Sequence, residues 1–197
     1  MDTKPIQIPK KAIQSVAGGL LLMAFFTIAW AGIASGSLQN TGRVIDLVFF
    51  GACIITFTGY AIYFFRSVKL FQGVMTEEEK IEGKKAGKAF GIVFGLEGIL
   101  IFVAVNICVN LGHPELTVPA IALVVGLHFY PMGKIFKRTM DYYLATWSTA
   151  IAIGAMVLIL KHVVLPIPVL AMLGIGMAIS TSIYGLNMIR VGLGYLK

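Results

Sequence analysis

Two ionisable residues, Glu97 and His128, lie deep inside long apolar stretches of the sequence. A charged side chain in the hydrocarbon core of a membrane costs at least about 2.5 kcal/mol, so an ionisable residue retained there is a candidate for function. Imidazoles and buried carboxylic acids can both exchange protons near neutral pH. Glu97 lies about eight residues after the start of one apolar stretch, and His128 about eight before the end of the next, so we expect them to meet at matching depth on adjacent antiparallel helices. Together they could bind a proton, a cation or a polar substrate. The alternative is a structural hydrogen bond between helices, which contributes about 1 kcal/mol.

The residues that follow His128 add to the interest of this stretch. Pro131 has no amide to bond the carbonyl of Leu127, so we expect a kink and a free carbonyl beside His128. The run Leu-His-Phe-Tyr-Pro at 127–131 resembles a Leu-His-Phe-x-Pro motif of small multi-spanning bacterial inner-membrane proteins. The resemblance extends at most to Tyr142 and Tyr143. Since that family has no assigned activity, the resemblance implies a membrane location and no reaction.

Further polar residues could complete a site. Ser180, Tyr184 and Asn187 recur at i, i+4 and i+7, which places them on one face of a helix. We expect this face to line a cavity with Glu97 and His128, although hydrogen bonds between helices would explain it equally well. The candidate residues for a substrate or proton site are Glu97, His128, Tyr130, Ser180, Tyr184 and Asn187.

Motifs of familiar catalytic and cofactor sites are missing from the sequence. There is no Gly-x-Ser-x-Gly, P-loop, His-Glu-x-x-His or Cys-x-x-Cys pattern. We therefore predict no catalytic residue of a soluble-enzyme type and no cofactor. His113, Glu115 and His162 could meet at one face of a membrane, but they lack the spacing of metal ligands, so we predict no metal site.

The composition is that of a membrane protein. Of 197 residues, 58% are apolar and 13% are charged, and the mean hydropathy is +0.88. Soluble domains are about 45–50% apolar and about 25% charged. Six continuously apolar stretches reach the roughly 20 residues that a spanning helix needs, whereas strands of a membrane barrel would alternate. The stretches are 12–35, 44–65, 89–111, 118–136, 142–160 and 167–189. We predict an all-α fold, with residues 1–197 forming one bundle of six transmembrane helices.

The basic residues predict the orientation of this bundle. Fourteen of the 16 Lys and Arg residues fall on one side of the six spans, and only Arg43 and Lys161 fall on the other. Cytoplasmic loops carry the excess of Lys and Arg, so we expect both termini in the cytoplasm, most simply of a bacterial cell. The net charge of +7 then reflects topology and attraction to anionic headgroups, and not binding of nucleic acid.

The cytoplasmic loop at 66–88 contains a helix start. Thr76 is followed by three glutamates, and the pair Thr76 and Glu79 fits a capping box. We expect a helix that begins here and continues into the third span. Its charged residues are explained by a solvated surface or, alternatively, by the docking of a protein partner.

Glycines mark the third span as a packing surface. Gly87, Gly91 and Gly95 recur every four residues, and Asn106 lies about 180° from Glu97 on a helix. Because opposite faces are then unsuited to lipid, we expect this helix at the centre of the bundle. We assign helix packing to these three glycines and to Pro131.

Three functions remain open. The first is a small transporter or channel-like protein with a proton- or cation-linked site in the cytoplasmic half. In size and topology alone, the chain resembles the substrate-capturing subunits of energy-coupling-factor vitamin transporters. The second is an accessory, stress-response or immunity-type membrane component that acts through a partner. The third is an intramembrane enzyme built from Glu97, His128 and Tyr130, for which the residue types are the only support.

Overall fold

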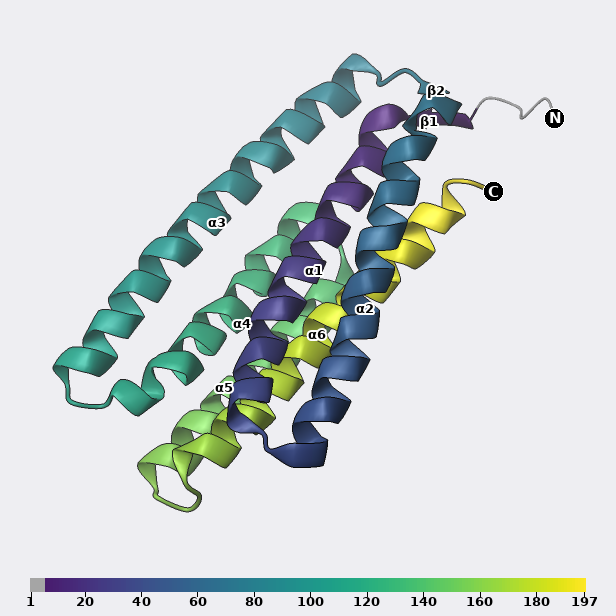
Figure 1. The fold of residues 1–197 in the computed structure, drawn as a ribbon. Coiled ribbons are helices and arrows are strands. Elements are labelled where there is room, and N and C mark those ends of the chain that lie inside the picture. The colour runs from purple at the N-terminus through teal and green to yellow at the C-terminus, as the bar shows by residue number, and fades with distance from the viewer. Residues whose placement is uncertain (1–5) are drawn as a thin grey trace.

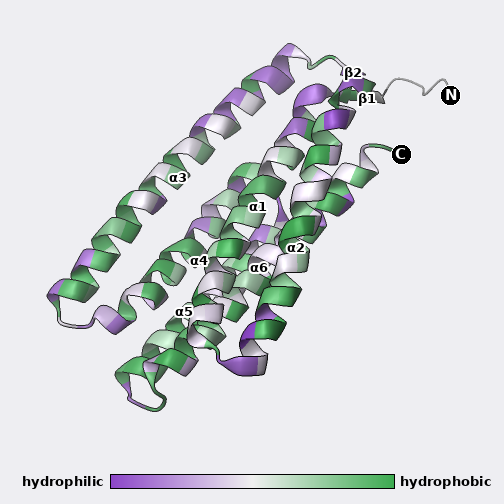
Figure 2. Ribbon diagram, in the orientation of Figure 1, coloured by the Kyte–Doolittle hydropathy of each residue, from purple (hydrophilic) through white to green (hydrophobic). Residues whose placement is uncertain are grey.

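The computed structural model describes residues 6–197 and forms a bundle of six long helices (Figure 1). The helices are α1 (Lys10–Ser37), α2 (Asn40–Ser67), α3 (Glu77–Asn110), α4 (Thr117–Phe136), α5 (Thr139–Leu160) and α6 (Pro166–Gly194). Each is long and apolar enough to cross a membrane, which confirms the predicted all-α fold. Polar residues gather at the helix ends and in the first turns of α3 (Figure 2).

The observed helices extend beyond the predicted spans because their end turns are polar but still hydrogen-bonded. The largest difference is α3, which begins at Glu77, twelve residues before the third apolar stretch. Strand β1 and the C-terminal end of α6 lie at the same end of the bundle (Figure 1), as an even number of spans requires. Lys4, which contributes to the charge asymmetry, lies outside the described residues, and the side of the membrane stays a prediction.

Helix α6 is the central element of the bundle. It packs along α1 and also contacts α2, α4 and α5. Fourteen of its residues are buried, more than in any other described helix. Small residues allow this, since Gly185 and Gly192 leave room for the rings of Phe57 and Phe64 of α2. The fully buried Phe57, Phe64 and Phe71 then fill the core at this end.

The prediction that the third helix is central is wrong. Helix α3 lies at the edge of the bundle and packs mainly against α4 (Figure 1). Only Glu97 and Cys108 of α3 are buried. Gly87, Gly91 and Gly95 face open space, because a Cβ added at any of them would meet nothing within 4 Å, so they do not pack helices within this chain. Asn106 tolerates exposure because its amide donates to the carbonyl of Phe102 at 2.7 Å.

Two short elements were not expected from the sequence. Strand β1 (Ile6–Pro9) pairs in parallel with β2 (Phe71–Gly73), which follows the single turn η1 (Val68–Leu70). The pairing joins the segment before α1 to the segment after α2. The fully buried Phe71 fixes this connection in the core. A further turn, η2 (Pro114–Leu116), joins α3 to α4.

The predicted start of the third helix is confirmed. Thr76 Oγ1 accepts from the amide of Glu79 at 3.2 Å, and Glu79 Oε2 accepts from the amide of Thr76 at 2.8 Å. The capping box is thus closed on both sides.

Replacing Thr76 with alanine should therefore loosen the first turn of α3 by about 1 kcal/mol. Hydrogen exchange should show faster exchange of the amides of residues 77–80, while Thr76→Ser, which keeps the hydroxyl, should resemble the native protein. Equal exchange in the alanine variant would mean that the cap contributes nothing.

Candidate functional site

Glu97 of α3 and His128 of α4 meet between their helices. His128 Nδ1 lies 3.3 Å from Glu97 Oε1, and 12% and 6% of the two side chains, respectively, remain exposed. The predicted contact at matching depth is confirmed. The helices bring it about because Glu97 lies on the only face of α3 that packs, in line with the buried Cys108 nearer the other end of the helix.

The contact leaves hydrogen-bonding capacity unused. Neither His128 Nδ1 nor Glu97 Oε2 has a hydrogen-bond partner among the described residues, although both atoms are buried. Buried polar atoms are nearly always paired with protein, water or a ligand. The arrangement therefore has a free acceptor oxygen at its centre, next to an imidazole that can hold or release a proton.

Helix α4 continues through Pro131 to Phe136. Pro131 itself is exposed, so the packing role predicted for it is wrong for this chain's own helices. Small residues elsewhere allow α4 to pack: at Gly126, an added Cβ would lie 2.7 Å from the backbone nitrogen of Thr149 in α5. This close approach aligns α4 and its His128 on α5.

A second polar cluster is separated from Glu97 and His128 by the side chain of Phe129. The ring of Phe129 contacts both His128 and Tyr184, with centroid distances of 4.3 and 6.1 Å. Tyr184 of α6 is buried, and its hydroxyl accepts from Arg138 Nη1 at 2.9 Å. Tyr184 therefore belongs to a neighbouring cluster and not to the contact between Glu97 and His128.

Asp141 is the member of this second cluster that the sequence did not reveal. Its side chain is fully buried, and neither carboxylate oxygen has a hydrogen-bond partner among residues 6–197. The N-cap position of α5 is occupied by Arg138, and Asp141 lies in the first turn of this helix. Arg138, which donates to the hydroxyl of Tyr184, brings a positive charge into the neighbourhood of this carboxylate.

The other predicted site residues are not gathered around the pair. Ser180 donates to the carbonyl of Gly176 at 3.1 Å and accepts from Ser148 at 3.3 Å, which is a link between α5 and α6. The hydroxyl of Tyr130 lies 3.1 Å from that of Thr146, and this side chain is partly exposed. Asn187 is half-buried. Ser180, Tyr184 and Asn187 do belong to one continuous helix, α6, but neither described cavity joins them to Glu97 and His128. For Ser180, the alternative of a hydrogen bond between helices is the one observed.

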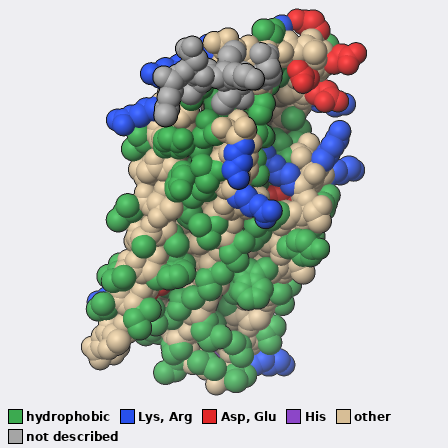
Figure 3. Space-filling view, turned by 90° about the vertical axis from the view of Figure 1, so that its right-hand side faces the viewer, with side chains coloured by type: hydrophobic (Ala, Val, Ile, Leu, Met, Phe, Trp, Pro, Cys, Tyr) green, Lys and Arg blue, Asp and Glu red, His purple; other side chains and the backbone are tan. Residues whose placement is uncertain are grey.

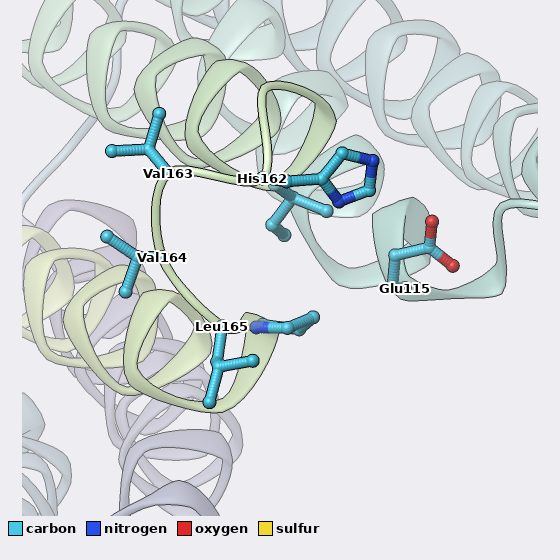
Figure 4. A pocket seen from close by; sticks show the side chains of 7 residues that line it. Glu115, His162, Val163, Val164 and Leu165 are labelled. Carbon is cyan, nitrogen blue, oxygen red and sulfur yellow. The ribbon is translucent and has the colours of Figure 1, made fainter.

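Two of the cavities formed by residues 6–197 lie near the ends of the bundle, and neither of these two is lined by Glu97 or His128. One cavity of about 410 Å³ lies where the connection between α5 and α6 faces η2. Glu115 and His162 face each other across it, with Val163, Val164 and Leu165 along its wall (Figure 4). Nδ1 of the neighbouring His113 lies 3.0 Å from Glu115 Oε1. Within residues 6–197, no group of three potential ligands could hold a metal ion.

The fold and its buried polar contacts define a class of protein. Six helices of sufficient length and apolar character make this a multi-pass integral membrane protein. Compared with known protein families, with curated proteins and with solved structures, the chain matches none of them. The resemblance of residues 127–131 to the Leu-His-Phe-x-Pro motif accordingly stays a prediction.

Proposed function

We propose that this protein is a small transporter or channel-like protein in which Glu97 and His128 form a site for a proton or a small cation. The observation that carries the proposal is the contact at 3.3 Å between two ionisable side chains that are buried between spanning helices. Both would be costly in that environment without a companion. A function that uses the pair explains why α3 and α4 retain it.

Charge balance limits the states of the pair. A neutral imidazole with a protonated carboxyl, or an imidazolium with a carboxylate, is neutral overall, and each state contains one dissociable proton. Loss of this proton leaves one negative charge between the helices, which a cation would neutralise. Glu97 Oε2, which lacks a partner among the described residues, supplies an oxygen to receive that cation.

The packing of α3 on the bundle suggests how protonation of the pair could move this helix. Helix α3 packs mainly against α4, and Glu97 lies within that interface. A change of charge at Glu97 therefore alters the one principal contact that fixes α3 to the bundle. We infer that α3 shifts against α4 as the pair gains or loses its proton, which would open a path between them.

Proton flux in vesicles tests the proposal. Purified protein in liposomes with a pH-sensitive dye inside would receive an imposed pH gradient, with the membrane potential clamped by potassium and valinomycin. The native protein should speed dissipation of the gradient, and Glu97→Gln should reduce this flux by about tenfold or more. Glu82→Gln is the matched control, since Glu82 is an exposed carboxylate on the same helix.

Equal flux in Glu97→Gln and the native protein, with both folded, would contradict the proposal. Vesicles with native protein that are no more permeable than empty vesicles, to protons or to sodium, would favour the second candidate, an accessory component. That candidate has one observation in its favour: the outward face of α3, including Gly87, Gly91 and Gly95, is open to a partner helix.

A further inference from the structure

A groove at the cationic end of the bundle has the chemistry of a phospholipid site. It has a volume of about 620 Å³ and lies between Tyr63 of α2 and the last turns of α6. Its walls are formed largely by aliphatic side chains, among them Leu186, Ile189 and Leu193. This apolar wall adjoins the part of α6 that spans the membrane.

The same groove contains two positive charges. Arg190 and Lys197 both line it and are both exposed. Neither forms a salt bridge with any residue that the structure describes. In Figure 3, most Lys and Arg side chains of this side of the molecule lie in its upper half, where Asp and Glu side chains also occur at the upper right, above a broad field of hydrophobic side chains. The groove thus joins an apolar wall to cations without a described counter-charge.

This combination selects an amphiphile with a negative head. The guanidinium of Arg190 can bind a phosphate with two parallel hydrogen bonds, and Lys197 adds a second charge. Basic pockets between spanning helices bind anionic headgroups in this way. Leu186, which is 53% exposed, offers a surface for an acyl chain directly beside the charged part. Tyr63 lies at the same edge, as amphipathic rings do at headgroup level.

We propose that the groove between Tyr63 and the C-terminal turns of α6 binds one anionic phospholipid, whose phosphate contacts Arg190 and Lys197. The site is specific, in contrast to the general attraction of a basic surface to a negative membrane. It requires only that this end of α6 lie at a headgroup layer, and it is independent of the site at Glu97 and His128.

Native mass spectrometry can test the site with defined lipids. The protein in a neutral detergent would be titrated with phosphatidylglycerol and, separately, with phosphatidylcholine of the same acyl chains. We expect one phosphatidylglycerol to bind about tenfold more tightly than phosphatidylcholine. The double variant Arg190→Gln with Lys197→Gln should lose this preference, and Arg190→Gln alone should lose most of it.

The control removes the same charge elsewhere. Lys84→Gln with Lys88→Gln changes two exposed lysines that lie on α3 and outside the groove. This variant should keep the preference for phosphatidylglycerol. The proposal is overturned if the control loses the preference as completely as the groove variant, or if the native protein binds both lipids equally. Since all four side chains are exposed, the variants should fold, which an unchanged melting temperature would verify.

Discussion

Replacing Gly174 with leucine should destabilise the bundle by about 3 kcal/mol or more, because α1 and α6 cross at this residue without room for a side chain. A Cβ at Gly174 would lie 2.7 Å from the backbone nitrogen of Ala34 and 2.9 Å from the carbonyl oxygen of Trp30. Both are backbone atoms of α1, so relief requires the helices to separate. Separation would also weaken the buried hydrogen bond between Thr27 and Thr181, at 2.8 Å.

Unfolding in increasing amounts of a denaturing detergent would measure the loss. Trp30 lies at the crossing and is buried, so its share of the tryptophan fluorescence should change when α1 separates from α6. Trp147 of α5, which is half exposed, contributes the remainder. Gly95→Leu is the matched control, since nothing lies within 4 Å of a Cβ at that position. We expect the control to unfold like the native protein. A control that is as unstable as Gly174→Leu would show that the crossing is not the cause.

The contrast between Gly174 and Gly95 shows which property of a glycine the sequence could not predict. The regular spacing of Gly87, Gly91 and Gly95 suggested a packing face, yet the close crossings use Gly126 and Gly174. Glycine is tolerated on a surface toward lipid as well as at a contact between helices. Which glycines serve as contacts depends on the partner helix, and a single sequence does not contain that information.

The spans themselves followed from hydropathy because the membrane imposes their length. Hydropathy identifies only the part of a helix that lies in hydrocarbon. Because the backbone hydrogen bonds continue beyond that part, the observed helices are longer than the predicted spans. Only for α3 did a local motif give the true start, since the capping side chains of Thr76 and Glu79 act within four residues. The parallel pairing of β1 with β2 joins segments more than sixty residues apart, so no local pattern could predict it.

The contact between Glu97 and His128 was predictable because it depends only on how deep each residue lies in the membrane-spanning part of its helix. Glu97 and His128 lie equally far from the facing ends of the predicted apolar stretches 89–111 and 118–136, and the antiparallel helices that contain these stretches bring them together. Asp141 was missed because its place near the start of α5 suggested exposure. It is nevertheless buried, in the part of α5 next to Arg138, whose guanidinium donates to Tyr184 of α6. The spacing of Ser180, Tyr184 and Asn187 indicated one face of a helix, but it could not indicate what that face contacts. Ser180 bonds to Ser148 of α5, whereas Tyr184 bonds to Arg138.

Removing one member of the buried pair Glu97 and His128 should lower the free energy of unfolding more than removing both. In His128→Leu, Glu97 loses its only described ionisable companion and faces an apolar surrounding. We expect a loss of about 2.5 kcal/mol near neutral pH, the cost of a charge or an unpaired carboxyl at that depth. In the double variant Glu97→Leu with His128→Leu, no polar group is left without a partner. This variant should therefore be clearly more stable than His128→Leu alone, as replacement of whole buried ion pairs has shown in general.

The pH dependence separates this explanation from simple loss of packing. The cost of His128→Leu should shrink as the pH falls, because a carboxyl that has taken up a proton no longer places a charge between α3 and α4. The double variant should show no such recovery, since it retains neither group. Detergent unfolding at two pH values, read from the same tryptophan fluorescence, gives both comparisons. If the two variants are equally unstable at every pH, the two side chains that meet at 3.3 Å contribute only packing to the interface between α3 and α4. Neither charge nor proton binding would then explain why an ionisable pair occurs there.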